Sequence, residues 1–179
     1  IEGLTTQQAT KEIARIAKNR TRNQAEALTR TLVNHIGSVA RAEVYRDNAD
    51  IIVGERYMAT LDARTTLTCS GFDGKRFDIG EGPHPPMHFN CRSVRVPVIA
   101  EEFRIPGQAD RASVNGPVDG RTTYGGWLKG QPKEFQNEVL GPERAALFRS
   151  GKVSISKFTD SRGAVYSLAE LKQREGITI

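Results

Sequence analysis

The sequence predicts an α+β fold with a helical N-terminal arm, a small β-containing domain around a Cys/His loop, and a mostly helical C-terminal appendage. Residues 5–50 carry apolar side chains at helical spacing, whereas short strand-like runs separated by turn signals follow at 57–98. Helices that precede a small sheet are typical of this class. We therefore predict a first domain at 1–104, a linker or extended arm at 105–123, and the appendage at 124–179.

The helical arm begins at a capping signal, because Thr5 and Thr6 are residue types that cap helix N-termini. A second helical segment shows the i, i+3, i+4 pattern of an amphipathic helix at Ala25, Leu28, Leu32, Val33, Ile36, Ala40 and Val44. Its polar side carries four arginines: Arg22, Arg30, Arg41 and Arg46. These arginines either bind nucleic-acid phosphates or form a solvated helix face.

Short strands and a tight turn are predicted after the arm. Residues 57–61 have the composition of a strand that leads into a turn, and Asp73-Gly74 is a strong turn signal. Residues 94–98 alternate valine with Arg95 and Pro97. Because proline cannot donate to a ladder of hydrogen bonds, this run predicts a strand at a sheet edge.

Two polar clusters accompany these strands, Asp62-x-Arg64-Thr65 and Arg92-Ser93. We expect them to fix turns through buried hydrogen bonds and an ion pair.

The C-terminal third is predicted to be helical. Glycine and proline are frequent between residues 105 and 121, which is typical of a linker. A helix is expected after Gly141-Pro142 and should stop at Gly151. Ser167 and Glu170 have the spacing of a capping box and predict a last helix. Contacts with a neighbouring subunit, rather than a core of its own, are expected to order this appendage.

Composition limits the classes of protein. The chain has 179 residues, 37% of them hydrophobic, a net charge of +5 and a pI near 9.4. This length suits one medium domain or one domain with an appendage. The positive charge favours acidic partners such as DNA, or serves solubility. The sequence contains no apolar run near the roughly 18 residues of a membrane span, and two cysteines exclude a disulfide framework.

Both cysteines and two of the three histidines lie in one segment, with the spacing C-x14-H-x3-H-x2-C. Cys69, His84, His88 and Cys91 are ligand types that a tetrahedral zinc ion prefers, and Pro85-Pro86 stiffens the loop between them. Three interpretations stay open from the residues alone. They are a structural zinc site, a Cys69–Cys91 disulfide, which a reducing cytosol disfavours, and two buried thiols with loop-capping histidines.

The same segment offers a nucleophile beside a base. Cys69 or Cys91 with His88 is a pairing that covalent catalysis uses, but no oxyanion site or orienting acid occurs at recognisable spacing. Gly80-x-Gly82 is followed by proline, which lacks the N–H that a phosphate-binding loop needs. The residues therefore favour a protein that is not an enzyme.

Several motifs occur in a fixed order: ATLDART at 59–65, Cys69, FDGK at 72–75 and PPMHFNCRS at 85–93. This order resembles the signature of the bacteriophage Mu F-like minor head proteins, a family that includes head morphogenesis proteins of SPP1-like phages. The helical lead-in and the tail from Tyr124 to Phe148 are also similar. The positions that match the family pattern are Asp62, Arg64, Cys69, Asp73, Gly74, His88, Asn90, Cys91 and Arg92. His84 falls outside it, which leaves three zinc ligands and a fourth to find, an aspartate or water.

The resemblance implies a minor protein of the virion head, made in the host cytoplasm, which acts in capsid or portal assembly and enters the host with the genome in some relatives. Its partners would be portal or capsid proteins, and its metal a structural zinc. Two alternatives are a head-carried effector enzyme, either a nuclease or similar to an ADP-ribosyltransferase, which would use His88, Arg64 and Arg92, and a non-specific DNA-binding module on the arginines of the second helix.

Overall fold

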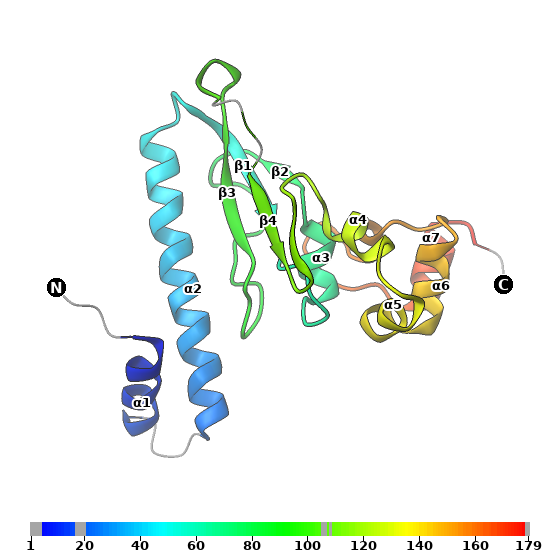
Figure 1. Cartoon of the computed structure of the whole chain (residues 1–179), viewed down its shortest axis with the longest axis horizontal. Helices are drawn as coiled ribbons and strands as arrows, with labels where there is room; N and C mark the ends of the chain where they lie inside the picture. Colours follow the sequence, from blue (N-terminus) through cyan, green and yellow to red (C-terminus); the bar gives the residue numbers. More distant parts are fainter. Residues whose placement is uncertain (1–4, 17–20, 105–106, 108, 178–179) are drawn as a thin grey trace.

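The computed structural model describes residues 5–16, 21–104, 107 and 109–177. The molecule is elongated, with a helical arm at one end, a sheet in the middle and small helices at the other end (Figure 1). This arrangement confirms the α+β class and the helical N-terminal and C-terminal parts. The predicted helical stretch includes residues 17–20, which lie outside the described residues.

The arm consists of α1 (Thr6–Ile16) and α2 (Arg22–Asp47), which pack against each other. Thr5 caps α1 as predicted, because its side chain accepts from the Gln8 N–H while the Gln8 side chain accepts from the Thr5 N–H. Thr21 and Gln24 form the same reciprocal box at the start of α2. α2 then runs beside the sheet, and α1 lies on the side of α2 away from it (Figure 1).

α2 is amphipathic in sequence, but the apolar stripe is not the face that contacts the sheet. Towards the sheet it buries Ser38 and Tyr45, and Asn34 is half-buried there. The apolar positions beyond the reach of α1 are exposed instead, by 43% to 66%: Leu32, Val33, Ile36, Val39 and Val44. An apolar stripe normally faces the core. Here side chains that can hydrogen-bond the loop and strand occupy the docking face, which corrects the usual interpretation of the pattern.

The sheet has three antiparallel strands in the order β2-β1-β3: β2 (Arg76–Phe77), β1 (Ile52–Met58) and β3 (Val94–Ile99). The edge position predicted for the last strand is confirmed, with Pro97 opposite Glu55. The predicted strand at 57–61 is wrong in its bounds, because β1 begins at Ile52 and ends at Met58. Its first half carries Gly54 and Glu55, which obscure the alternation of apolar residues.

A buried ion pair explains the polar residues within the sheet. Glu55 Oε2 lies 2.8 Å from the Arg95 guanidinium, and both side chains are at most 2% exposed. Arg95 also donates to the carbonyl oxygens of Pro83 and Glu81 at 2.9 and 2.7 Å, and it stacks over the Phe77 ring. Arg95 thus ties the proline-rich loop to the sheet.

The predicted linker contains a packed hairpin, β4 (Asp110–Ser113) paired with β5 (Gly116–Asp119), although residues 105, 106 and 108 lie outside the described part. The short 3-10 helix η1 (Glu101–Phe103) precedes it. The Val114 N–H donates to Leu61 O at 3.0 Å, which docks the hairpin on the first domain. Gly116 at the hairpin turn has a φ of 105°, a backbone conformation that glycine adopts readily because it lacks a Cβ atom.

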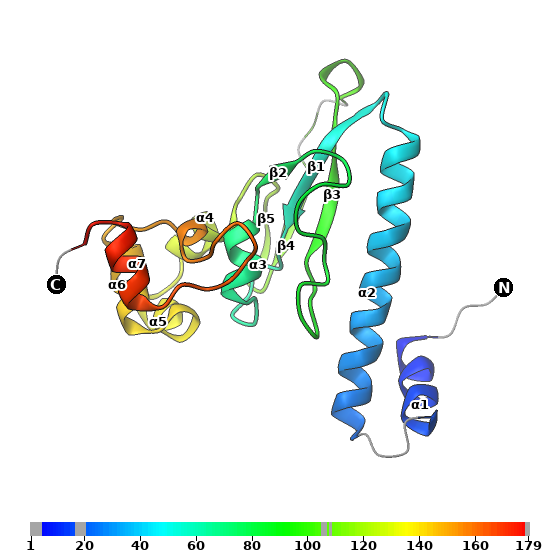
Figure 2. The same cartoon turned by 180° about the vertical axis from the view of Figure 1, so that it is seen from behind.

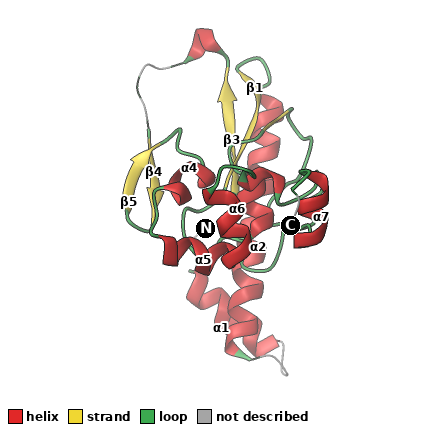
Figure 3. Ribbon diagram, turned by 90° about the vertical axis from the view of Figure 1, so that its right-hand side faces the viewer, coloured by secondary structure: helices red, strands yellow, loops and turns green. Residues whose placement is uncertain are grey.

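The C-terminal helices are α4 (Tyr124–Lys129), α5 (Lys133–Leu140), α6 (Pro142–Arg149) and α7 (Leu168–Arg174), with the 3-10 helix η2 (Ile155–Lys157). Pro142 stands in the first turn of α6, and Ser167 and Glu170 form the predicted capping box of α7. Figure 2 shows α5, α6 and α7 gathered into one unit away from the arm, and Figure 3 views the molecule from the side of this unit. None of the described helices combines the length and apolarity that crossing a bilayer requires.

This unit has a core of its own, contrary to the expectation that a neighbouring subunit orders it. The core contains Tyr124, Trp127, Leu128, Leu140, Ala145, Phe148, Val153, Ile155, Phe158 and Leu171, together with Leu61 from the first domain. Trp127 packs edge-on against Tyr124 and Phe135. A second, smaller core surrounds Tyr57, Cys69, Phe72 and Cys91.

Candidate metal centre

Two elements bring Cys69, His88 and Cys91 together. Cys69 lies on α3 (Leu67–Phe72), and His88 and Cys91 lie in the loop that leads into β3. Cys69 Sγ is 3.8 Å from Cys91 Sγ and 3.2 Å from His88 Nε2. All three ligand atoms lie within 4.8 Å of one another. This group could hold a metal ion.

Two of the three separations are close to the edges of a tetrahedral zinc site, and the third, between Cys91 Sγ and His88 Nε2, is at most 4.8 Å. Zinc–sulfur bonds of about 2.3 Å at the tetrahedral angle place two thiolates about 3.8 Å apart, and a thiolate and an imidazole nitrogen about 3.6 Å apart. The Sγ–Sγ distance of 3.8 Å matches the first value, and the Sγ–Nε2 distance of 3.2 Å is slightly shorter than the second. Because His88 is only half-buried, a small movement of its ring removes this difference.

Hydrogen bonds orient the side chains around this group. His88 Nδ1 lies 2.8 Å from Phe89 O, and since a carbonyl oxygen only accepts, Nδ1 carries the proton. The lone pair of Nε2 therefore faces Cys69, as in metal-bound histidines whose other nitrogen donates to a carbonyl. The Tyr57 hydroxyl donates to Cys69 Sγ at 3.3 Å.

The two thiols differ in acidity. The pKa of Cys91 is lowered to about 5, chiefly because the Cys69 thiol donates to its sulfur, with further hydrogen bonds from the backbone of Met87 and Ser93. The pKa of Cys69 is raised by that donation to Cys91 and by burial. One thiolate is thus stabilised before any metal binds, and thiolates are the form that zinc binds.

Two of the sequence interpretations are corrected. Both cysteines are free, and a sulfur separation of 3.8 Å is far beyond the roughly 2.05 Å of a disulfide bond. His84 does not join the group of ligands among the described residues. It lines a groove between α2 and the proline loop, with His35 and Glu43 on the helix side. The four-ligand set is therefore reduced to three, because the rigid Pro85-Pro86 segment separates His84 from His88.

The Asp62 turn contains the predicted hydrogen bonds and ion pair. The Asp62 carboxylate accepts from Arg64 N–H at 3.0 Å and from the Thr65 hydroxyl at 3.2 Å, and it pairs with both terminal nitrogens of Arg92. Burial opposes ionisation, but Arg92 and these donors outweigh it and lower the pKa of Asp62. The partner of Asp62 is Arg92, and the Arg64 side chain is exposed.

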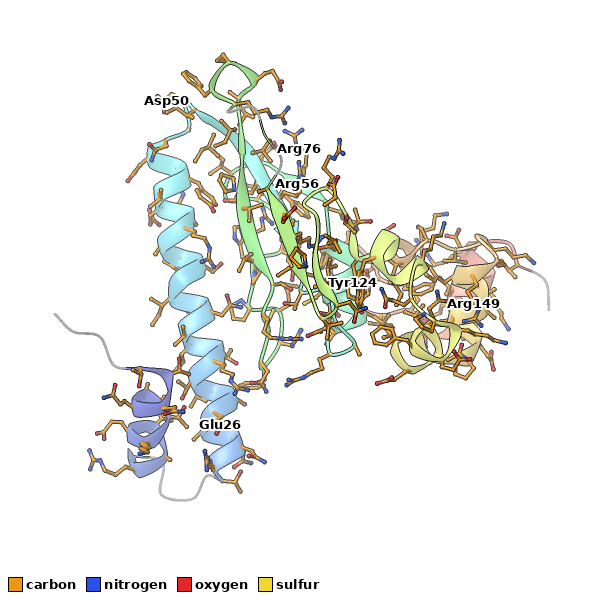
Figure 4. The ribbon with its side chains drawn as sticks, in the orientation of Figure 1. Glu26, Asp50, Arg56, Arg76, Tyr124 and Arg149 are labelled. Atoms are coloured by element: carbon orange, nitrogen blue, oxygen red, sulfur yellow. The ribbon has the colours of Figure 1, made fainter. Side chains whose placement is uncertain are left out.

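Asp73 and Gly74 form the predicted turn. The Asp73 side chain also forms a junction between the end of β1, the hairpin and the C-terminal helices. The Asp73 carboxylate is 1% exposed and accepts from Ala59 N–H, from Tyr124 N–H and from both terminal nitrogens of Arg111. Gly74 has a φ of 80°, and its N–H donates to Tyr57 O. Figure 4 labels Tyr124 where the sheet region meets the C-terminal helices. Arg111 was not predicted, because a lone arginine in a glycine-rich segment carries no signal.

The loop that carries His88 and Cys91 is also the docking site of α2. Asn90 has a φ of 59°, and its N–H donates to the Thr31 hydroxyl at 3.0 Å. Asn34 Nδ2 donates to the carbonyl oxygens of Cys91 and Ser93, at 2.8 and 3.2 Å. The long helix therefore contacts the residues that frame the ligands.

The four arginines proposed for phosphate binding do not form one free surface. Arg22 and Arg30 pair with Glu26, whose position near the lower end of α2 is labelled in Figure 4, and Arg46 pairs with Glu43. Arg41 is half-buried beside Gly37. These pairs neutralise much of the charge that a phosphate would meet, and the DNA-binding hypothesis stays a prediction.

A cavity of about 10 Å³ adjoins Cys69 and His88. Its walls include Thr60, Arg64, Thr65, Thr66, Asn90, Arg92 and Ser93. A cavity holds one water when its volume reaches roughly 10–15 Å³. This space beside the thiol and the imidazole has about the volume of one water molecule, which favours metal binding over nucleophilic catalysis.

Comparison with known proteins assigns the family. The family model described as Phage Mu protein F like protein matches residues 1–96, more than half of the 179-residue chain. No curated protein and no solved structure matches the chain. The matched segment contains the arm, β1, α3, β2 and all three candidate ligands. The chain therefore belongs to the family of phage Mu F-like proteins, and membership of this family indicates a phage head morphogenesis protein.

Proposed function

We propose that this protein is a minor component of the virion head that acts in capsid or portal assembly by binding portal or capsid proteins. The family supports a head role, and the exposed apolar face of α2 supports a binding role. Leu32, Val33, Ile36, Val39 and Val44 form this face. Exposed apolar patches in soluble proteins mark interaction sites more often than chance.

A pair of valine substitutions tests this proposal. Val33 on α2 and Val53 on β1 are 55% and 54% exposed, so they differ in location but not in accessibility. Each valine is replaced by glutamate, and the variants are co-expressed with the portal and major capsid proteins of the same phage. We expect Val33→Glu to reduce co-purification at least tenfold and Val53→Glu to leave it unchanged. Equal effects of the two substitutions would contradict a docking role for α2.

We further propose that Cys69, His88 and Cys91 hold a structural zinc ion. The observation that carries this proposal is the Sγ–Sγ distance of 3.8 Å, which is the distance between two sulfur ligands of a tetrahedral zinc ion. The fixed imidazole tautomer and the amide donors to Cys91 support it. Such an ion contributes on the order of 10 kcal/mol in small zinc domains, and here it joins α3 to the loop before β3.

Elemental analysis of the purified protein tests the metal. We expect one zinc per chain in the wild type, and loss of zinc with a lower melting temperature in Cys69→Ser and Cys91→Ser. The histidines offer a matched pair: His88→Ala should lose the metal and His84→Ala should keep it. Retention of zinc by His88→Ala, or its loss from His84→Ala, would refute the three-ligand assignment.

A further inference from the structure

The zinc site leaves one tetrahedral position without a protein ligand, because the described residues bring three ligand atoms together. The cavity of about 10 Å³ touches two of those ligands, Cys69 and His88. Hydroxyl groups lie around it: Thr66 Oγ1 is 3.1 Å from His88 Nε2, and Ser93 is a lining residue. The free position and a polar space the size of one water therefore adjoin each other.

Asn90 also lines this cavity, and its side chain carries an unpaired acceptor. Asn90 Oδ1 is buried and has no hydrogen-bond donor among the described protein groups. A buried amide oxygen is almost always satisfied by protein or by ordered water.

We propose that one water molecule is the fourth ligand of the zinc ion and donates a hydrogen bond to Asn90 Oδ1. This inference rests on the zinc site proposed above and names its remaining ligand. The water occupies the cavity next to Cys69 and His88, whose volume is about that of one water molecule. The site is thus a zinc centre with three protein ligands and one coordinated water.

X-ray absorption spectroscopy of the zinc-loaded protein tests the ligand set. We expect two sulfur atoms at about 2.3 Å and two nitrogen or oxygen atoms at about 2.0 Å from the metal. A third sulfur, or a single light atom, would overturn the water ligand while leaving zinc binding intact. A protein that binds no zinc would instead refute the zinc proposal.

The Asn90 contact is tested by Asn90→Gly, which keeps the positive φ and removes the amide. We expect the zinc affinity to fall roughly 10- to 100-fold, the usual effect of losing a group that supports a metal ligand. Asn115→Gly, in the exposed turn of the hairpin, is the matched control and should leave the affinity unchanged. Equal affinities of Asn90→Gly and the wild type would overturn the hydrogen bond to water.

The size of the fourth ligand is tested with cobalt in place of zinc. Charge-transfer bands report the two thiolates, and the visible bands report the fourth ligand. We expect azide to leave the spectrum of the cobalt protein unchanged, because the space beside the ligands has about the volume of one water molecule. A shift of the visible bands with saturating dependence on azide would overturn the single-water assignment.

Discussion

At the scale of single residues, Asp73 has the largest structural role. One carboxylate accepts from the strand end at Ala59, from the first N–H of α4 at Tyr124, and from Arg111 on the hairpin. A carboxylate has about four acceptor positions, and three separate segments use them here. The side chain therefore holds the first domain, the hairpin and the C-terminal unit in one arrangement.

Removing this charge should be costly. Asp73→Asn leaves the Arg111 guanidinium, which is 7% exposed, without its counter-charge. Breaking a buried ion pair from one side costs roughly 3–5 kcal/mol. The free energy of unfolding should therefore fall by about this amount, and the midpoint of urea denaturation should fall with it. The control Glu101→Gln removes an exposed partner of Arg104 and should have no measurable effect. Equal midpoints for Asp73→Asn and the wild type would contradict the junction role.

The Asp62 carboxylate should give the fold an acid-sensitive component. Its pKa in the folded state lies below the unfolded value of about 3.9, so its stabilisation is full above that value and is lost as pH falls through the folded pKa. We expect Asp62→Asn to be less stable than the wild type at pH 7 and the difference to shrink below about pH 4. Unfolding free energies measured from pH 3 to 7 check this. A difference that stays constant with pH would exclude the carboxylate as the cause.

The site could be predicted in part from residue types. Cysteines and histidines in one segment made zinc one of three interpretations, and Cys69, His88 and Cys91 do lie together. Spacing alone did not exclude His84, because the direction of the proline loop depends on Arg95, which donates to carbonyl oxygens within it. Supporting residues such as Tyr57 come from a distant strand, and no local pattern identifies them.

At the scale of elements, caps predicted where several helices begin, whereas the short helix α3 was not predicted. The start of α1 at Thr6, the capping box of α7 and the proline in the first turn of α6 follow from local backbone chemistry. Periodicity could not tell which face of α2 docks, because docking uses hydrogen bonds to a loop as well as apolar contacts. The hairpin was missed for a similar reason: Arg111, rather than an apolar core, anchors it.

The docking of α2 should depend on one amide. Asn34 Nδ2 donates to two carbonyl oxygens beside the metal site, whereas Asn23 on the same helix is exposed. We expect Asn34→Ala to destabilise the protein by about 1–3 kcal/mol, because two half-buried carbonyl groups lose their donor. Asn23→Ala should be neutral. Thermal unfolding measures both, and the prediction fails if the two variants melt together.

At the scale of the whole molecule, the described residues form two separate apolar cores. The larger one lies among the C-terminal helices with Leu61, and the smaller one surrounds Cys69 and Phe72. The smaller core contains both thiols of the metal site. Regions with separate cores open with separate free energies.

Metal removal should therefore act on one region more than the other. With a strong chelator and a reductant present, we expect hydrogen exchange to quicken by at least tenfold in the loop at 84–92, in β3 and in α3. Amides of α5 and α6 should change much less, because their core excludes the ligands. Mass spectrometry of peptic fragments measures both regions. Uniform acceleration along the chain would contradict the independence of the two cores.

The Asp73 junction also limits how this family module can be recombined. The family match ends at residue 96, yet the guanidinium and the backbone N–H that Asp73 needs come from Arg111 and Tyr124, beyond it. A different C-terminal partner grafted onto the module must bring its own cation and its own helix start to that carboxylate. The boundary that sequence similarity marks is therefore not the boundary at which the chain can be cut.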